Sequence, residues 1–165
     1  MIKAAAIILI LAAPATGAQT IVEGGPEWLD KRAEVFSSVC MAAAPDFAAF
    51  DAKAEAAGLE RIEQGWHLPP EAFLSLRAHD GFCSCFMTVG APDQTEMVGA
   101  IFGRLMQDWG ASFTGKAEGL ANVAPFQRDG IEAVSILEPR KIDGQNWLSA
   151  RVTVFGACPD GEGGQ

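Results

Sequence analysis

The sequence has no tyrosine and only two histidines among its 165 residues. It also lacks Gly-x-Ser-x-Gly, His-Glu-x-x-His and any glycine loop of the kind that cradles phosphate groups. These absences exclude the enzyme classes that such motifs define. The four cysteines include no Cys-x₂₋₄-Cys pair, so the spacing typical of a structural zinc site is missing too. The sequence therefore predicts no cofactor and no resident metal, and it assigns no catalytic residue.

Basic residues are also scarce, with 12 Lys and Arg against 21 Asp and Glu and a net charge of −9. An acidic domain repels nucleic acid and anionic membrane surfaces, so we expect no nucleic-acid partner. A membrane-spanning helix needs about 20 apolar residues. No segment after residue 18 meets that requirement, and we expect no membrane span in the mature chain.

Residues 1–18 have the organisation of a cleavable secretory signal peptide. Lys3 supplies one positive charge, and the apolar stretch 4–13 that follows is roughly half as long as a spanning helix. Small residues two apart predict cleavage after Ala18, and cleavage after Ala15 also fits. No cysteine follows the apolar stretch, which argues against a lipid anchor. We therefore expect the protein in the periplasm or secreted.

An even number of cysteines in an exported chain indicates disulfides, and the four are Cys40, Cys83, Cys85 and Cys158. A bond between Cys83 and Cys85 would strain an extended strand, because the Cβ atoms of residues two apart lie too far from each other. We expect Cys40 to pair with Cys83 or Cys85 and Cys158 to pair with the other. The sequence leaves both pairings open.

The same segment permits two other interpretations. His79, Cys83, Cys85 and Met87 together offer one imidazole and three sulfurs, which are ligands that suit copper(I). Cys83-Ser84-Cys85 would alternatively be a redox pair, although the usual redox motif is Cys-x-x-Cys at the start of a helix. Structural disulfides are favoured over both.

Apolar residues at helical spacing predict helices from Pro26 to Cys40, from Pro45 to Gly58 and from Asp93 to Trp109. A weaker alternation predicts one strand between Leu59 and Trp66. The stretch 72–89 alternates on both sides of Asp80-Gly81, a dipeptide that suits a two-residue hairpin turn.

Pairing the residues outward from that turn sets Ala78 opposite Cys83 and Leu76 opposite Cys85. This face of the hairpin is almost wholly apolar, so both cysteines are predicted to face the core. The helical stripe of the first helix also carries Cys40 inward. A helix packed on this sheet would therefore bring the disulfide partners together.

Two further strands are predicted, at 131–137 and 147–155. Asp143-Gly144 lies between them, but a tight turn there would pair Val152 and Val154 with the wrong alternating set of residues in the earlier strand. We therefore expect a longer loop across 138–146. The segment 110–130 has no clear period and is expected to be a long loop available for ligand or partner contact, or to contain a short strand.

These elements predict an α+β fold of two layers, with a mostly antiparallel sheet of four to five strands and about three helices packed on it. Residues 19–157 would form a single domain, followed by a polar C-terminal tail at 158–165. The oligomeric state is left open.

The favoured function is a non-enzymatic binding or accessory module of the cell envelope, acting on an unknown envelope protein or small ligand. The segment 110–130 and an exposed Trp66-His67 turn are the expected contact sites. One alternative is an envelope hydrolase that uses His67 or His79 with a carboxylate. The other is soft-metal handling of copper in the periplasm through His79, Cys83, Cys85 and Met87.

Overall fold

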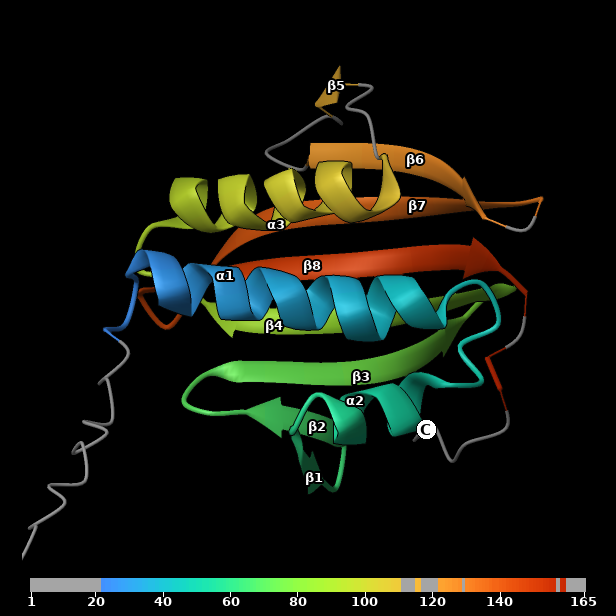
Figure 1. The fold of residues 1–165 in the computed structure, drawn as a ribbon, viewed down its shortest axis with the longest axis horizontal. Helices are drawn as coiled ribbons and strands as arrows, with labels where there is room; N and C mark the ends of the chain where they lie inside the picture. The colour runs from blue at the N-terminus through green and yellow to red at the C-terminus, as the bar shows by residue number, and fades with distance from the viewer. Residues whose placement is uncertain (1–21, 111–114, 117–121, 129, 157, 160–165) are drawn as a thin grey trace, which may run out of the picture.

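The computed structural model describes residues 22–110, 115–116, 122–128, 130–156 and 158–159, in which helices cover one face of an antiparallel sheet (Figure 1). The helices are α1 (Pro26–Val35), continued by the π-helix η1 (Phe36–Met41), then α2 (Phe50–Ala56) and α3 (Gln94–Trp109). The strands are β1 (Glu60–Ile62), β2 (Gly65–Leu68), β3 (Ala72–His79), β4 (Phe82–Gly90), β5 (Gly115–Lys116), β6 (Asn122–Arg128), β7 (Ile131–Ile142) and β8 (Gln145–Phe155). The predicted α+β class is confirmed.

Among the described residues the sheet has eight strands in the order β1-β2-β3-β4-β8-β7-β6-β5. The expected number of four to five strands was wrong for two reasons. The stretch predicted as one strand between Leu59 and Trp66 folds back on itself as the hairpin β1–β2. In addition, β5 and β6 both lie within the segment 110–130, for which the sequence predicted a long loop or one short strand.

Local signals set the ends of the helices. Pro26 lies in the first turn of α1, where its missing N–H costs no hydrogen bond. The Asp93 carboxylate accepts hydrogen bonds from the backbone N–H groups of Thr95 and Glu96 and so caps α3. Gly110 ends α3 in the left-handed region at φ +61°. The predicted helix from Asp93 to Trp109 is thereby confirmed.

The hairpin β3–β4 has the predicted register, with Leu76 opposite Cys85 and Ala78 opposite Cys83. Asp80 and Gly81 form its turn with φ values of +35° and +84°. Both cysteines are fully buried beneath the helices.

The longer loop expected between β7 and β8 is wrong. Asp143 and Gly144 form a tight turn with φ values of +51° and +82°, and Ile142 pairs with Gln145 directly across it. This register sets Ser135 opposite Val152 and therefore turns Val134 and Ile136 away from the helices. The expected loop is wrong because Val152 and Val154 pair with Ser135 and Ala133, two small residues of β7 that face the core.

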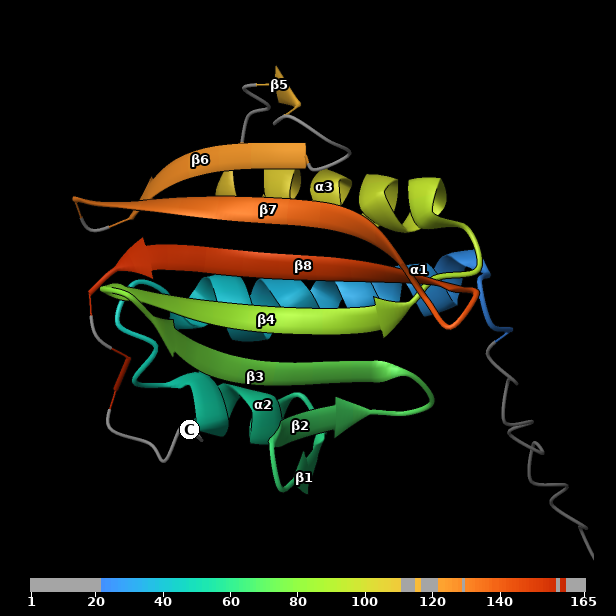
Figure 2. The ribbon, with the colours of Figure 1, turned by 180° about the vertical axis from the view of Figure 1, so that it is seen from behind.

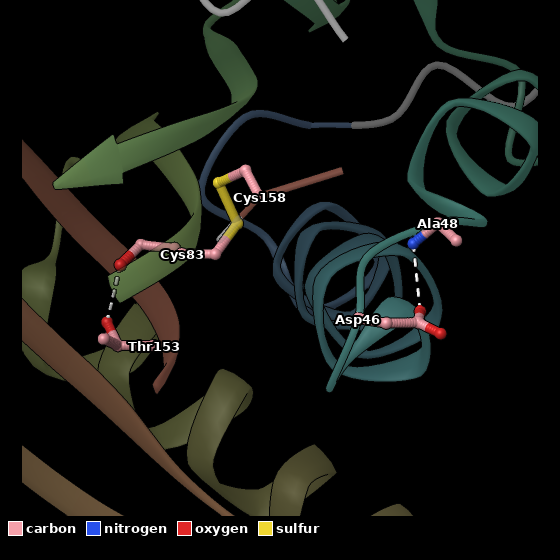
Figure 3. The surroundings of a disulfide bond; sticks show 6 residues. Asp46, Ala48, Cys83, Thr153 and Cys158 are labelled. Carbon is pink, nitrogen blue, oxygen red and sulfur yellow. Dashed lines mark hydrogen bonds between the residues drawn. A yellow bond between two sulfur atoms is a disulfide. The ribbon is translucent and has the colours of Figure 1, made fainter. Parts of the chain in front are cut away.

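Two disulfides fasten the helical layer and the C-terminal segment to β4. Cys40 of η1 is bonded to Cys85, and Cys83 is bonded to Cys158 (Figure 3). The second bond follows from topology, because β8 is the neighbour of β4 and ends beside Cys83. The expected polar tail is described only at Cys158 and Pro159, and the proposed signal peptide lies wholly outside the described residues.

Candidate functional site

The face of the sheet opposite the described helices, here called the open face, carries no described helix (Figure 2). It consists of the odd-numbered residues of β3 (73–79) and β8 (147–155) and the even-numbered residues of β4 (82–88) and β7 (132–142). At one edge it continues onto His67 of β2 and onto Glu60 and Ile62 of β1. Strand alternation sends the intervening side chains to the core beneath the helices.

The open face holds several large apolar side chains that remain accessible to solvent. Phe73 is 40% exposed and Phe155 is 73% exposed. Ile62 and Ile142 are exposed near the two margins of the face. The ring of Phe155 lies against that of Phe82, with centroids 4.6 Å apart. Exposed apolar side chains that gather on one surface mark an interaction site more often than isolated ones do.

Two arginines flank a phenylalanine near the middle of this face. The guanidinium carbon of Arg77 lies 5.5 Å from the ring centroid of Phe86, and that of Arg151 lies 5.7 Å from it. Arg77 Nε also donates a hydrogen bond to Ser75 Oγ at 3.5 Å. Neither arginine forms an ion pair with a carboxylate of the described residues.

Hydroxyl groups fill the space between these aromatic and cationic side chains. Ser84 and Thr153 lie opposite each other on β4 and β8, and their hydroxyl oxygens are 2.9 Å apart in a hydrogen bond. The centre of the open face therefore combines an apolar surface, paired hydroxyls and two cations.

His67 and Trp66 do not form the exposed turn that the sequence predicted. Both lie in β2, and Trp66 is buried with its Nε1 donating to Asp51 Oδ1 of α2 at 2.8 Å. Partial burial would raise the pKa of Asp51, but hydrogen bonds from Trp66 and Arg61 outweigh it and keep the pKa below its ordinary value. Trp66 thus joins α2 to the sheet and is not a contact residue.

The two histidines lie on the open face rather than inside a closed pocket. The His67 ring stacks on Phe73 with centroids 4.8 Å apart, and its Nδ1 is 3.8 Å from the Glu60 carboxylate. His79 is largely exposed, with Nε2 3.9 Å from Asp80. Neither separation is a hydrogen bond of the kind that orients a general base.

The residues of the copper hypothesis are not brought together. His79 lies on the open face, whereas Met87 and both cysteines face the core, and both cysteine sulfurs are in disulfides. Within the described ranges, no group of three or more His, Cys, Asp or Glu side chains is arranged to hold a metal ion. Cys83 and Cys85 are bonded to other cysteines and not to each other, so the bonds do not support a redox role for them as a pair.

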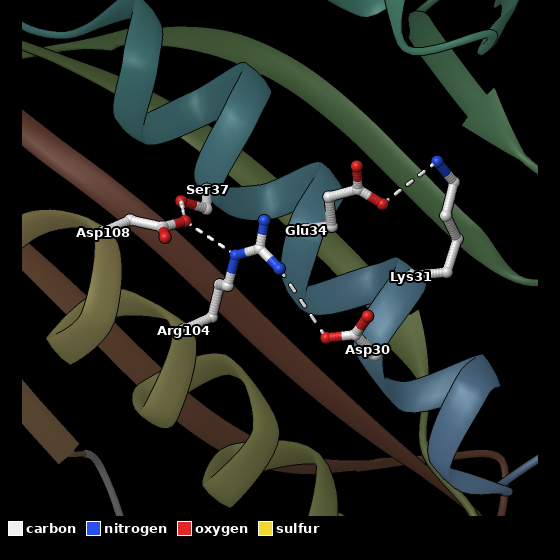
Figure 4. A network of polar contacts seen from close by, with 6 residues as sticks. All are labelled: Asp30, Lys31, Glu34, Ser37, Arg104 and Asp108. Carbon is white, nitrogen blue, oxygen red and sulfur yellow. Dashed lines mark hydrogen bonds and ion pairs between the residues drawn. The ribbon is translucent and has the colours of Figure 1, made fainter.

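A polar network that the sequence analysis missed joins η1 to α3 (Figure 4). Ser37 donates a 2.7 Å hydrogen bond to Asp108 and accepts one of 2.8 Å from Trp109 Nε1. Arg104 Nε donates to the same carboxylate at 2.7 Å, and its far end approaches Asp30 at 3.7 Å. The i,i+4 spacing of Arg104 and Asp108 was the only signal of it in the sequence.

The hydrogen bonds from Ser37 and Arg104 hold the pKa of Asp108 below its ordinary value. Both hydrogen bonds are accepted by Oδ2, and together they keep the carboxylate ionised. An ionised carboxylate that is held by two neighbours is suited to joining two helices, and it is poorly suited to transferring a proton.

One charged side chain is buried on the opposite side of α1. Arg32 lies 3.7 Å from the ring centroid of Trp28 and donates hydrogen bonds to the carbonyl oxygens of Trp28 and Pro69. Burial lowers its pKa to about 10, although Glu23 and Glu71 oppose the shift. These contacts fasten α1 to the segment that leads into β3, which is a packing role.

Comparisons with protein-family models, curated proteins and solved structures returned no match for this chain. None of the helices in the described part of the chain combines the length and the apolar character that crossing a bilayer requires. The assignment of function therefore rests on the geometry of the open face and on the disulfides.

Proposed function

We propose that the protein is an exported, disulfide-stabilised module of the cell envelope that binds a partner without catalysis, and that the open face is its binding surface. Disulfides form and persist in oxidising compartments, and the two bonds here suggest an extracytoplasmic location. Residues 1–18 supply a matching export signal. Cleavage after Ala18 would leave Gln19 at the mature N-terminus, which intact mass spectrometry of the purified protein would detect.

The placement of apolar residues on β7 carries the assignment of the binding surface. This strand directs Ala133, Ser135 and Leu137 to the core and places the partly exposed Val134 and Ile136 on the open face. A sheet with one solvated face ordinarily keeps apolar residues inward and polar residues outward, and on β7 a serine faces inward while two aliphatic side chains face outward. Apolar side chains held on the helix-free side are explained if a partner covers them.

The size of the face fits a protein interface. The four strands β3, β4, β8 and β7 have 8 to 12 residues. At ~3.3 Å per residue and ~4.8 Å between strands they span about 30 Å by about 15 Å, and the shorter β2 and β1 extend one edge. A standard interface buries roughly 800 Å² on each partner, and a partner that covers these strands and this edge would bury an area of that order without any contribution from the segment 110–130.

The geometry gives less support to the two alternatives. A hydrolase based on His67 or His79 needs an imidazole oriented by a carboxylate beside a pocket. Both rings lie on the open face, and their nitrogens are 3.8 and 3.9 Å from the nearest carboxylate oxygens, which is longer than a hydrogen bond. Copper handling needs free thiols, and Cys83 and Cys85 are bonded to other cysteines.

Site-specific photocrosslinking in the cells that export the protein tests the proposed surface. A photoreactive phenylalanine at position 73 or 155 should give a crosslinked product of discrete mass, because both positions lie on the open face. Met106 is also an exposed apolar residue, but it lies on α3 in the helical layer and is the matched control. Equal crosslinking at 106, or none at 73 and 155, would refute the open face as the binding surface.

A further inference from the structure

We infer that the partner of the open face is an amphipathic helix that carries carboxylates beside its apolar stripe, and that Arg77 and Arg151 recognise those carboxylates. This inference rests on the proposed function and adds the chemistry of the partner to it.

The central strands of the open face carry only positive fixed charge. On β3, β4 and β8 the ionisable side chains of this face are Arg77, His79 and Arg151, and no Asp or Glu is present. The whole chain has a net charge of −9. A cationic centre in an acidic protein favours an acidic partner over a neutral or basic one.

The carboxylates at the margins of the open face do not neutralise the two central arginines. Glu138 of β7 is paired with Arg140 at 3.0 Å. Glu132 lies at the far end of β7, Glu60 lies on β1 beside His67, and Asp80 lies in the β3–β4 turn beside His79. Arg77 and Arg151 thus retain donors for a carboxylate that comes from outside the described chain.

The contact with Phe86 prepares both arginines for binding. A guanidinium held near an aromatic ring has fewer accessible rotamers, so less entropy is lost when it forms hydrogen bonds. Because both guanidinium carbons lie within 5.7 Å of the same ring centroid, they are close enough to contact neighbouring groups of one partner element. Each planar guanidinium can then donate two parallel hydrogen bonds to a carboxylate.

A helix is the partner element that this surface favours. The opposite face of the same sheet is already covered by helices, which is the standard packing of a two-layer α+β domain. A helix of about 20 residues is ~30 Å long and matches the length of the central strands. Residues one and two turns apart rise ~6 Å and ~10.5 Å along the helix, a spacing at which two carboxylates can reach the two arginines.

The apolar residues of the open face favour a polypeptide over an anionic polysaccharide. Phe73, Phe155, Val134 and Ile136 offer apolar area to bury and no hydrogen-bonding groups. A polysaccharide presents many hydroxyl groups, for which these four side chains offer no hydrogen-bonding partner. An amphipathic helix covers the phenylalanines and aliphatic side chains with its stripe and reaches the arginines with its margin.

Fluorescence anisotropy with defined peptides tests the inference on the full mature protein. The probe is a labelled 20-residue helix of Leu, Ala and Glu, and the comparison probe has Gln in place of every Glu. We expect the Glu peptide to bind at least tenfold more tightly at low salt and to lose most of that advantage at high salt. The variants Arg77→Gln and Arg151→Gln should each weaken binding of the Glu peptide by roughly tenfold and leave the Gln peptide unaffected.

Arg140→Gln is the matched control, because Arg140 is on the same face but is already paired with Glu138. It should change the affinity for the Glu peptide less than twofold. Circular dichroism and the urea midpoint of each variant show whether the fold is retained. Arg77→Lys and Arg151→Lys keep the charge without the planar fork, and they should bind with intermediate affinity.

Three results would overturn the inference. Equal binding of the Glu and Gln peptides, unaffected by the arginine variants, would show that carboxylates are not recognised. Tighter, arginine-dependent binding of an alginate oligosaccharide would assign the site to an anionic polysaccharide. A dimer in light scattering that Arg151→Gln dissociates would assign the surface to a second copy of this chain. In each case crosslinking at positions 73 and 155 would still test the proposed function separately.

Discussion

At the scale of single residues, the network around Asp108 shows how local bonds hold the helical layer together. Ser37 is buried, and its hydroxyl is both donor to Asp108 and acceptor from Trp109. Loss of a buried hydrogen-bonding group costs more than the bond itself, because the former partners lose solvation as well. The network therefore makes a prediction about stability and one about pH.

Ser37→Ala should lower the free energy of unfolding by about 1–3 kcal/mol. Ser38 is the next residue and is exposed, so Ser38→Ala is the control and should change stability by less than about 0.5 kcal/mol. Urea denaturation followed by tryptophan fluorescence measures both. Equal effects of the two substitutions would contradict a specific role for the Ser37 hydroxyl.

Acid should destabilise the fold through Asp108 and Asp51, whose pKa values are both lowered from the ordinary 3.8 in the folded chain. A carboxyl group with a lowered folded pKa stabilises the fold fully above its unfolded pKa, and this contribution is lost as pH falls through the folded pKa. The urea midpoint should accordingly stay level from pH 7 to about pH 5 and fall below about pH 4. Asp108→Asn should be less stable at pH 7 and should show a shallower fall; an unchanged slope would refute the assignment.

At the scale of elements, α3 and β7 show how far local sequence patterns determine orientation. The buried side of α3 follows its helical period, with Met97, Ile101 and Leu105 inward. β7 directs Ser135 inward and Val134 and Ile136 outward, because its register is set by the tight turn to β8. Caps and turns act over a few residues, so they can be predicted, whereas the choice of inward face depends on the neighbouring strand.

Gly99→Ala and Gly103→Ala should each stabilise the protein by about 0.5–1 kcal/mol. Both glycines lie inside α3, and a Cβ added at either position meets nothing within 4 Å. Glycine in a helix interior loses more backbone entropy on folding than alanine does. Gly110→Ala is the opposite control, since φ there is +61° and the same change should destabilise. Thermal melting of the three variants gives the comparison, and a loss of stability at 99 or 103 would contradict it.

At the scale of the whole molecule, the two disulfides close loops of 45 and 75 residues and connect three parts of the chain. One bond joins the helical layer to the sheet, and the other fixes the segment after β8. In the chain-entropy description, bonds that close loops of this length stabilise a domain by about 4 kcal/mol each, and disulfides typically contribute about 2–4 kcal/mol.

Removal of either disulfide should therefore lower stability by about 2–4 kcal/mol. Cys40 and Cys85 are fully buried, whereas Cys158 is only partly buried, so mild reductant should open the Cys83–Cys158 bond first. Alkylation after graded reduction, followed by peptide mass spectrometry, measures the order. Free thiols in protein purified without reductant from the oxidising compartment would contradict the bonded state.

The sequence by itself determined the α+β class, the helix that Asp93 caps and the register of β3–β4, because each depends on residues close in the chain. It also limited the disulfides to two pairings through the geometry of Cys83 and Cys85. Only the tertiary structure decided that Cys158 bonds Cys83, since this depends on β8 lying beside β4. The open face also depends on tertiary contacts. Trp66 is buried and hydrogen-bonded to Asp51 of α2, and the register with β8 turns Val134 and Ile136 outward. Contacts between residues distant in the sequence therefore created the candidate site, and the local pattern did not.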